Sequence, residues 1–123
     1  KIYTLRGFHY QTLPSHESKI ITCIKGEIYN IVLDLRRKSK TYKKWISVIL
    51  NDKKKNSLLI PSGCANAYLT MKKDTIIHYY MSDFYNPNSY KGIRYNDPLF
   101  KFVWPKKPKV ISLRDKSFKN INV

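Results

Sequence analysis

A close succession of short runs rich in β-branched and aromatic residues most constrains the fold of this chain. The runs cover residues 19–25, 27–35, 44–50, 57–60, 65–71 and 75–82. Such runs, bounded by turn-forming residues, are typical of β-strands. No helical periodicity extends far enough to predict a helix of structural weight, and no internal repeat is visible. Closely spaced short strands therefore predict an all-β sandwich or barrel.

Four short segments punctuate these runs. Lys25-Gly26 and Asn51-Asp52 suit tight hairpin connections, whereas Pro61-Ser62-Gly63 and Asn86-Pro87-Asn88-Ser89 break the pairing between strands. A chain of 123 residues is long enough to bury a modest core. We therefore expect a single domain that covers residues 1–123.

The charge balance favours an anionic partner. Twenty-four Lys and Arg against eight Asp and Glu give a formal net charge of +16, which attracts anions by simple electrostatics. The basic residues fall in short runs between the predicted strands, and no helix-turn-helix, RNA-binding signature or basic helix is visible. This distribution predicts a lysine-rich, solvated surface and no nucleic acid partner. A phosphate-bearing small ligand or an anionic membrane surface fits the charge equally well.

Other sequence signals bear on compartment and metal binding. No apolar run approaches the roughly 20 residues needed to span a bilayer, and the N-terminus lacks a signal-peptide pattern, so we expect no transmembrane segment and a cytoplasmic protein. Cys23 and Cys64 have no CxxC spacing and are predicted to be buried thiols. His9, His16 and His78 show no HxH spacing, which predicts no metal site. The latter two histidines are predicted to be structural or exposed.

One motif carries candidate chemistry. The hexapeptide Arg6-Gly7-Phe8-His9-Tyr10-Gln11 is followed by Lys19, ten residues after the histidine. Histidine titrates near neutrality and can act as a general base, and a lysine ammonium can stabilise a developing oxyanion. The pair suits proton abstraction beside a carbonyl group, although two residues alone identify no enzyme.

Residues 1–118 resemble the dTDP-4-dehydrorhamnose 3,5-epimerase family in the order and spacing of their motifs. Beyond the hexapeptide, the matching stretches are Lys25-Gly26-Glu27-Ile28-Tyr29, Val32-Leu33-Asp34-Leu35-Arg36, Thr41-Tyr42-Lys43-Lys44-Trp45, Leu59-Ile60-Pro61-Ser62-Gly63, Tyr85-Asn86-Pro87, Gly92-Ile93-Arg94-Tyr95-Asn96-Asp97-Pro98 and Ser112-Leu113-Arg114-Asp115. The resemblance implies a cupin-type jelly roll that binds its substrate inside the barrel mouth. It also implies a homodimer and a reaction that needs no cofactor.

The resemblance assigns four catalytic residues. His9 matches the family's base, which removes a proton from the sugar carbon beside a C4 ketone, and Asp115 matches the carboxylate that orients its imidazole. Lys19 matches the lysine that faces the C4 oxygen. Tyr79 matches the general acid, which returns the proton on the opposite face and so inverts the carbon.

The resemblance also indicates the substrate. Arg6 is expected to face the diphosphate of a nucleotide sugar, and Gln11 of the same motif is assigned to substrate binding. The implied activity is epimerisation of a nucleotide-linked 4-keto-6-deoxyhexose at C3, C5 or both, through an enolate. Its products are expected to feed surface polysaccharides such as lipopolysaccharide.

The chain departs from the family pattern at three places. Asn66 and Asn30 replace a histidine and an aspartate that the family usually pairs; both are assigned to substrate binding, and two amides cannot titrate. Tyr90 stands where an acidic residue is frequent. The chain also begins almost at the histidine motif, whereas family members place before it a region that contributes to the dimer interface and the nucleotide site. This departure leaves open the affinity and the identity of the nucleotide or other carrier.

These departures leave alternatives open. An epimerase acting on a single carbon is one. A catalytically degenerate cupin that binds a sugar or a partner without turnover is another. A ketoisomerase of the same barrel type is disfavoured, because such enzymes use closely spaced histidines that are absent around His9.

Overall fold

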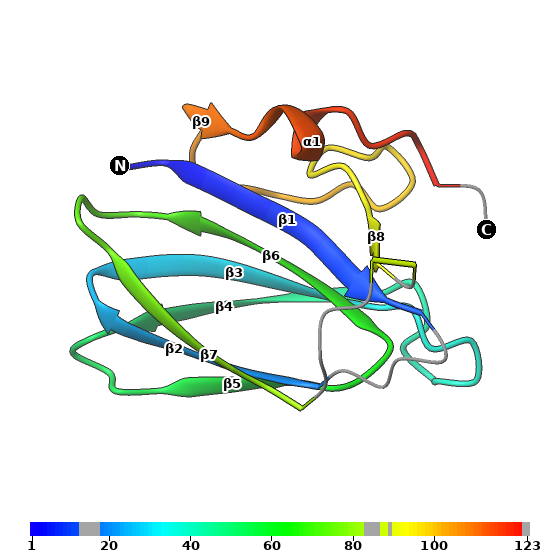
Figure 1. Cartoon of the computed structure of the whole chain (residues 1–123), viewed down its shortest axis with the longest axis horizontal. Helices are drawn as coiled ribbons and strands as arrows, with labels where there is room; N and C mark the ends of the chain where they lie inside the picture. The colour runs from blue at the N-terminus through cyan, green and yellow to red at the C-terminus, as the bar shows by residue number, and fades with distance from the viewer. Residues whose placement is uncertain (13–17, 83–86, 89, 122–123) are drawn as a thin grey trace.

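Two β-sheets face each other and carry a C-terminal segment along one side (Figure 1). This computed structural model describes residues 1–12, 18–82, 87–88 and 90–121. The larger sheet runs in the order β4 (Trp45–Asn51), β3 (Glu27–Asp34), β6 (Cys64–Thr70), β1 (Thr4–Gln11) and β8 (Tyr90–Gly92), with β9 (Val110–Ile111) parallel to the start of β1. The smaller sheet runs in the order β5 (Ser57–Ile60), β2 (Lys19–Lys25) and β7 (Ile76–Met81). One short helix, α1 (Leu113–Lys116), follows β9.

The expectation of an all-β jelly roll is confirmed. Each of the six predicted runs forms a strand whose ends lie within one residue of the predicted ends. The strands β1, β8 and β9 were not predicted. In β1 the apolar alternation is interrupted, because Gly7 has a φ of 112° and the pairing with β6 shifts register between Gly7 and His9. A bulge of this kind interrupts the alternation of apolar and polar residues by which a strand is recognised in a sequence.

The two hairpin predictions are wrong. Gly26 joins β2 to β3, and residues 52–56 join β4 to β5, yet in each case the two strands belong to different sheets. Both connections therefore turn a corner between the layers instead of closing a hairpin. Gly26 has a φ of 89°, and a Cβ there would lie 2.4 Å from Thr75 Oγ1.

The other two turn predictions have different outcomes. Pro61–Gly63 breaks strand pairing as predicted, because β5 and β6 lie in different sheets. Asn86 and Ser89 of the last predicted turn lie outside the described residues.

The space between the sheets holds one apolar core. It is formed by Ile21, Cys23, Ile28, Leu50, Ile60, Cys64 and Tyr68. Alternation along each strand brings these side chains to the inner face. Cys23 and Cys64 are free thiols with exposed fractions of 3% and 7%, so the prediction of buried thiols is confirmed.

A second core covers the outer face of the larger sheet. It comprises Phe8, Ile31, Leu33, Ala65, Ala67, Ile93 and Phe100, against which Phe102 and Trp104 pack. The rings of Phe8 and Phe102 stack with their centroids 4.4 Å apart. All seven residues of β6 are buried as a result. Because β1 and β6 are packed from behind, their inward-facing side chains have a rigid support.

Candidate active site

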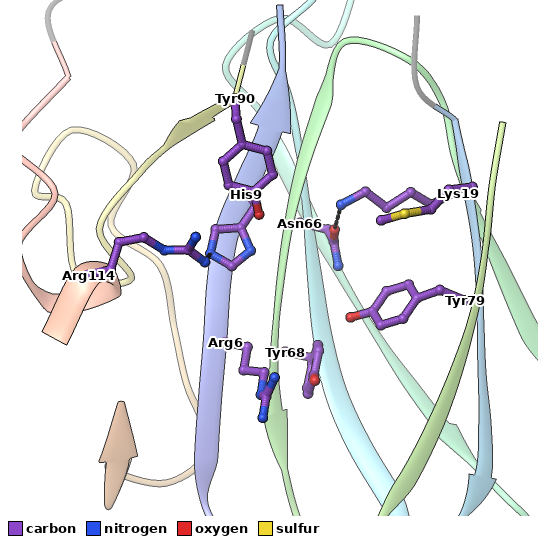
Figure 2. Close-up of a pocket in the computed structure, with 9 residues that line it drawn as sticks. Arg6, His9, Lys19, Asn66, Tyr68, Tyr79, Tyr90 and Arg114 are labelled. Atoms are coloured by element: carbon purple, nitrogen blue, oxygen red, sulfur yellow. Dashed lines mark hydrogen bonds between the residues drawn. The ribbon is translucent and has the colours of Figure 1, made fainter. Parts of the chain in front are cut away.

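A pocket of about 250 Å³ opens between β1, β6 and β7 (Figure 2). Its lining consists of Arg6, His9, Lys19, Asn66, Tyr68, Tyr79, Met81, Tyr90 and Arg114. These residues come from five strands and from α1. Five of them belong to the predicted site, so residues that are up to 73 positions apart in the chain, from Arg6 to Tyr79, meet at one place.

His9 is backed by a buried carboxylate. Its Nε2 lies 2.7 Å from Asp115 Oδ1, and the Gly7 backbone N–H donates to Asp115 Oδ2 at 3.1 Å. Burial by itself raises the pKa of Asp115, but hydrogen bonds from His9 and Gly7, together with the charge of Arg114, outweigh it and hold the pKa below its ordinary value. Asp115 is therefore ionised at neutral pH.

These contacts determine the tautomer of His9. An ionised carboxylate only accepts hydrogen bonds, so Nε2 must carry the proton and Nδ1 keeps its lone pair. Arg114 Nη2 also lies 3.2 Å from Nε2, but a guanidinium only donates and cannot bond to a protonated nitrogen. We assign the hydrogen bond to Asp115 because it is shorter and pairs a donor with an acceptor. A neutral imidazole held in this way can accept a proton at Nδ1.

Local backbone geometry aims His9 into the pocket. In the pairing of β1 with β6, Gly7 opposes Ala67 but His9 opposes Asn66, so Phe8 is an extra residue on β1. Phe8 enters the outer core while His9 faces the pocket. A Cβ at Gly7 would lie 2.6 Å from the Asn66 backbone oxygen. The glycine of the motif is thus required for the close approach of the two strands.

Lys19 begins a chain of buried polar side chains. It is 8% exposed, and its Nζ donates to Asn66 Oδ1 at 3.2 Å (Figure 2). Asn66 Nδ2 in turn donates to Asn30 Oδ1 at 3.3 Å. Because an ammonium can only donate, Lys19 sets the orientation of both amides. Asn66 orients the ammonium and brings no negative charge to it.

The end of this chain is unusual. Asn30 is fully buried, and its Nδ2 has no hydrogen-bond partner among the residues that the structure describes. An unsatisfied buried donor costs about 1–3 kcal/mol. The amide pair therefore orients Lys19 but lowers the stability of the folded protein.

Two phenols lie on the side of the pocket facing Arg6. Burial raises the pKa of Tyr79 far above its ordinary value, and the neighbouring phenol of Tyr68 raises it further, while the charge of Arg6 opposes both effects. Burial also raises the pKa of Tyr68. Both hydroxyls are therefore protonated at neutral pH and can act as proton donors.

The pocket is strongly basic. Arg6, Lys19 and Arg114 line it, and none of its described lining residues is Asp or Glu. A second pocket, of about 310 Å³, shares Arg6, Tyr68 and Tyr79 with the first and extends to Lys1. Cationic walls in a cleft attract anionic ligands. The two pockets together can hold an elongated anion, with Arg6 between its two parts.

The remaining predicted residues lie outside this pocket. Asn30 lies behind Asn66, and Asp115 lies behind His9. Gln11 is buried at the end of β1 and lines a separate pocket with Tyr10 and Arg37. The assignment of Gln11 to substrate binding stays a prediction.

The other two histidines have different outcomes. His78 is exposed beside Tyr80, as expected. His16 lies outside the described residues.

Sequence reasoning did not assign Tyr68, Met81, Tyr90 or Arg114 to the site. Strand alternation contained a signal for two of them, since Tyr68 follows Asn66 by two residues and Met81 follows Tyr79 by two. Arg114 is adjacent to Asp115. Tyr90 reaches the pocket through the pairing of β8 with β1, and its ring centroid lies 5.3 Å from that of His9.

The described part of the chain holds neither a metal-binding cluster nor a membrane-spanning helix. In residues 1–12, 18–82, 87–88 and 90–121, no group of three or more His, Cys, Asp and Glu side chains is arranged to hold a metal ion. Within the same ranges, no helix has the length and apolar character needed to cross a membrane.

The chain is similar to one family of known proteins. A family model described as dTDP-4-dehydrorhamnose 3,5-epimerase matches residues 1–122. A relative of that name from Sinorhizobium fredii is 34% identical over 118 residues, which cover 95% of this chain and 60% of the relative. The chain thus spans about three-fifths of the length of that curated relative.

Two solved structures, described as dTDP-4-dehydrorhamnose 3,5-epimerase and dTDP-6-deoxy-D-glucose-3,5-epimerase, superpose closely on the chain. The Bacillus anthracis structure, which has TDP and PPi bound, shows a TM-score of 0.94 at 30% identity and covers 98% of this chain and 69% of that one. A Legionella pneumophila epimerase in complex with dTDP-4-keto-L-rhamnose shows a TM-score of 0.89 at 30% identity, with coverage of 96% and 63%.

Proposed function

The chain belongs to the dTDP-4-dehydrorhamnose 3,5-epimerase family, and from this premise we propose that it epimerises a nucleotide-linked 4-keto-6-deoxyhexose. One observation carries the proposal. His9 with Asp115 behind it, the buried Lys19 and the phenol of Tyr79 converge on a single basic pocket. A base, an oxyanion-stabilising cation and an acid are the three groups that such a reaction requires.

The geometry supports the following reaction. Nδ1 of His9 takes the proton from the sugar carbon beside the C4 ketone, and the electron pair of the broken C–H bond moves onto the C4 oxygen. Lys19 stabilises this enolate, since an ammonium in a buried site acts more strongly than in bulk water. Tyr79 then returns a proton to the carbon. His9 on β1 and Tyr79 on β7 lie on opposite sides of the pocket (Figure 2), so the carbon is inverted.

Arg6 supports a diphosphate next to the sugar. It lines both pockets, and a guanidinium can make paired, charge-assisted hydrogen bonds to phosphate oxygens. We place the keto sugar in the first pocket and the diphosphate beside Arg6, with the nucleoside directed toward Lys1. The ligands of the Bacillus anthracis and Legionella pneumophila relatives, TDP with PPi and dTDP-4-keto-L-rhamnose, support a thymidine nucleotide as the first choice.

Deuterium exchange tests the function. The protein is incubated in deuterated water with dTDP-, UDP- and GDP-linked 4-keto-6-deoxyhexoses, and the C3 and C5 proton signals are followed by NMR. Loss of these signals together with new signals of the inverted sugar is expected for at least one donor. Binding of a donor without any exchange would refute turnover and favour the alternative, a cupin that binds sugar without catalysis.

Asn66 and Asn30 bear on the number of carbons that react. Neither amide can give or take a proton. Asn66 contacts Lys19 and Asn30 lies behind Asn66, at positions where the family usually has a titratable pair. We therefore propose that one of the two carbons is inverted faster than the other. Exchange at C3 and C5 with equal rates would contradict this.

An Asn66→Asp variant separates orientation of Lys19 from its charge. The new carboxylate can accept from Lys19, and also from Asn30 after that amide rotates so that Nδ2 replaces Oδ1, so thermal unfolding is expected at an equal or higher temperature. The ion pair neutralises Lys19, and turnover is expected to fall by more than about tenfold. Asn96→Asp is the control, because it adds the same charge beside Arg94 outside the pocket. An unchanged rate would show that the charge of Lys19 is not used.

We further propose that two copies of the chain associate through the outer face of the smaller sheet. Ile20 pairs there with Leu59 and Tyr80, which are 62% and 68% exposed, and Thr22 pairs with Ser57 and His78 in the next row. These two rows carry no Lys or Arg, although the chain has a net charge of +16. Two such faces can stack without bringing like charges together.

The oligomeric state checks this proposal. Sedimentation velocity is expected to give a dimer for the protein and a monomer for Leu59→Lys, and a monomeric protein would contradict it. The cytoplasmic location and the role in surface polysaccharide synthesis stay predictions.

A further inference from the structure

We propose that Phe118 is a positioning residue for His9, and that the motif Gly92-Ile93-Arg94-Tyr95-Asn96-Asp97-Pro98 holds its ring against the imidazole. This inference rests on the proposed epimerase function, in which His9 is the base. It gives a role to a stretch that resembles the family but contributes no residue to the lining of the pocket.

The orientation of the His9 ring needs more than one contact. Asp115 binds the imidazole at a single atom, Nε2, at 2.7 Å, and the outer torsion of a histidine side chain has only a broad preference. A half-turn about this torsion would exchange each ring nitrogen with a ring carbon. Nε2 would then leave Asp115, and Nδ1 would change sides. Packing against the ring must therefore select the orientation in which His9 can act as a base.

The ring of Phe118 supplies such packing. Its centroid lies 6.2 Å from that of His9, and the two ring planes meet at 81°, an edge-to-face arrangement that is favourable for aromatic pairs. Tyr90 contacts the same imidazole with its centroid at 5.3 Å and its plane tilted by 37°. Unlike Tyr90, Phe118 does not line the pocket. It therefore contacts the proposed base without contacting the substrate.

The approach of Phe118 to His9 depends on a glycine. Gly92 is directly opposed to His9 in the pairing of β8 with β1, and a Cβ at Gly92 would overlap with Cζ of the Phe118 ring. Gly92 is not among the glycines with a positive φ, so this position requires space and not backbone freedom. A side chain at Gly92 would therefore push Phe118 away from His9.

Two side chains of the same motif hold the segment that carries Phe118. Arg94 Nη1 donates to the Phe118 backbone oxygen at 3.2 Å, and Arg94 Nη2 donates to Asn120 Oδ1 at 2.6 Å. Asp97, which is only 1% exposed, accepts at Oδ2 from the Ile121 backbone N–H at 2.9 Å. The chain is thus anchored on both sides of Phe118, by α1 before it and by the motif after it.

The tautomer of His9 tests the inference directly. Protein with ¹⁵N-labelled histidines is studied by NMR at a pH at which the imidazole is neutral, and the His9 signals are identified by their absence from His9→Asn. We expect a single tautomer, with the proton on Nε2, in the unchanged protein. Gly92→Ala and Phe118→Leu should each give a mixture of both tautomers. Unchanged His9 signals in these two variants would overturn the inference.

Kinetics with a nucleotide-linked 4-keto-6-deoxyhexose provide the second test. We expect kcat to fall by about 3- to 10-fold in Gly92→Ala and in Phe118→Leu, the effect of losing one edge-to-face contact. KM should change by less than about twofold, because neither residue lines the pocket. Since Gly92→Ala acts through Phe118, the double variant should be no slower than the slower single variant. Losses that multiply in the double variant would contradict this mechanism.

Phe100→Leu is the matched control, because it makes the same replacement in the outer core, where the Phe100 ring stacks on Phe102. It should lower the temperature of unfolding but leave the His9 signals and the kcat of the folded protein unchanged. The same result in Phe118→Leu would indicate a merely structural role and overturn the inference alone. Absence of turnover in the unchanged protein with every donor would overturn the proposed function and the inference together.

Discussion

A His9→Asn variant is expected to lose both deuterium exchange and inversion by on the order of 10³-fold, the usual contribution of a general base, and to keep its fold. The reason lies in the contacts of the imidazole. Its Nε2 is engaged by Asp115 at 2.7 Å, which leaves Nδ1 as the one ring nitrogen able to take a proton. Asparagine offers no group that is basic near neutral pH, so the first proton transfer has no acceptor.

Two further variants distinguish loss of the catalytic base from loss of folding. His9→Gln can still donate an amide N–H toward Asp115 and should be equally inactive, with a circular dichroism spectrum like that of the unchanged protein. His78→Asn removes an exposed histidine on the outer face of β7 and should keep full activity. Retention of exchange in a folded His9→Asn protein would exclude His9 from the mechanism.

An Asp115→Asn variant is expected to slow both exchange and inversion by about 10²- to 10⁴-fold, because the wrong tautomer of His9 would be favoured. Each oxygen of Asp115 accepts a hydrogen bond, one from His9 Nε2 and one from the Gly7 N–H. An amide has a single oxygen. If that oxygen stays on Gly7, the NH₂ group faces Nε2, which must then accept and leaves the proton on Nδ1.

The same substitution should lower the free energy of unfolding by about 1–3 kcal/mol, because His9 and Gly7 lose the charged acceptor of their hydrogen bonds. The pH dependence has a definite sign. The pKa of Asp115 is below its ordinary value in the folded state, so its stabilising effect is complete above about pH 4 and is lost as the pH falls through the folded-state pKa. Urea unfolding of both proteins from pH 7 downward should show the difference shrinking with acidity.

A difference in stability that does not change with pH would contradict the hydrogen-bond argument for Asp115. Ser112 provides a check on the helix itself, because its Oγ accepts from the Asp115 backbone N–H at the start of α1. Ser112→Ala should destabilise the protein by about 1 kcal/mol without changing the tautomer of His9. Its effect on the two rates should therefore be small.

Only part of the candidate site could be predicted from the sequence. Motifs indicated which residues belong to the site, whereas the contacts between those residues depend on the tertiary fold. His9, Lys19, Tyr79 and Arg6 could be assigned because their motifs resemble a family, and the pocket contains all four. Their mutual geometry could not be predicted. The contact of His9 with Asp115 joins residues 106 positions apart, and no local pattern encodes such a distance.

Strand topology shows the same division. Local chemistry determined where the strands begin and end, since β-branched and aromatic residues favour the extended backbone wherever they occur in a run. Lys25-Gly26 favours a tight turn, and the local chemistry of such a turn is the same in a hairpin and at a corner between two sheets. Which sheet the next strand joins depends on burial of its apolar face against the rest of the chain, and this is a property of the whole fold.

The sequence by itself thus determined the all-β class, the ends of six strands, the burial of Cys23 and Cys64, and the family. The tertiary structure decided the tautomer of His9, the orientation of the Asn66 amide, and the presence of Tyr68 beside Tyr79. The physical reason is that propensity and alternation act between neighbours in the chain, whereas hydrogen bonds and burial in the site join five strands and a helix that are distant in sequence.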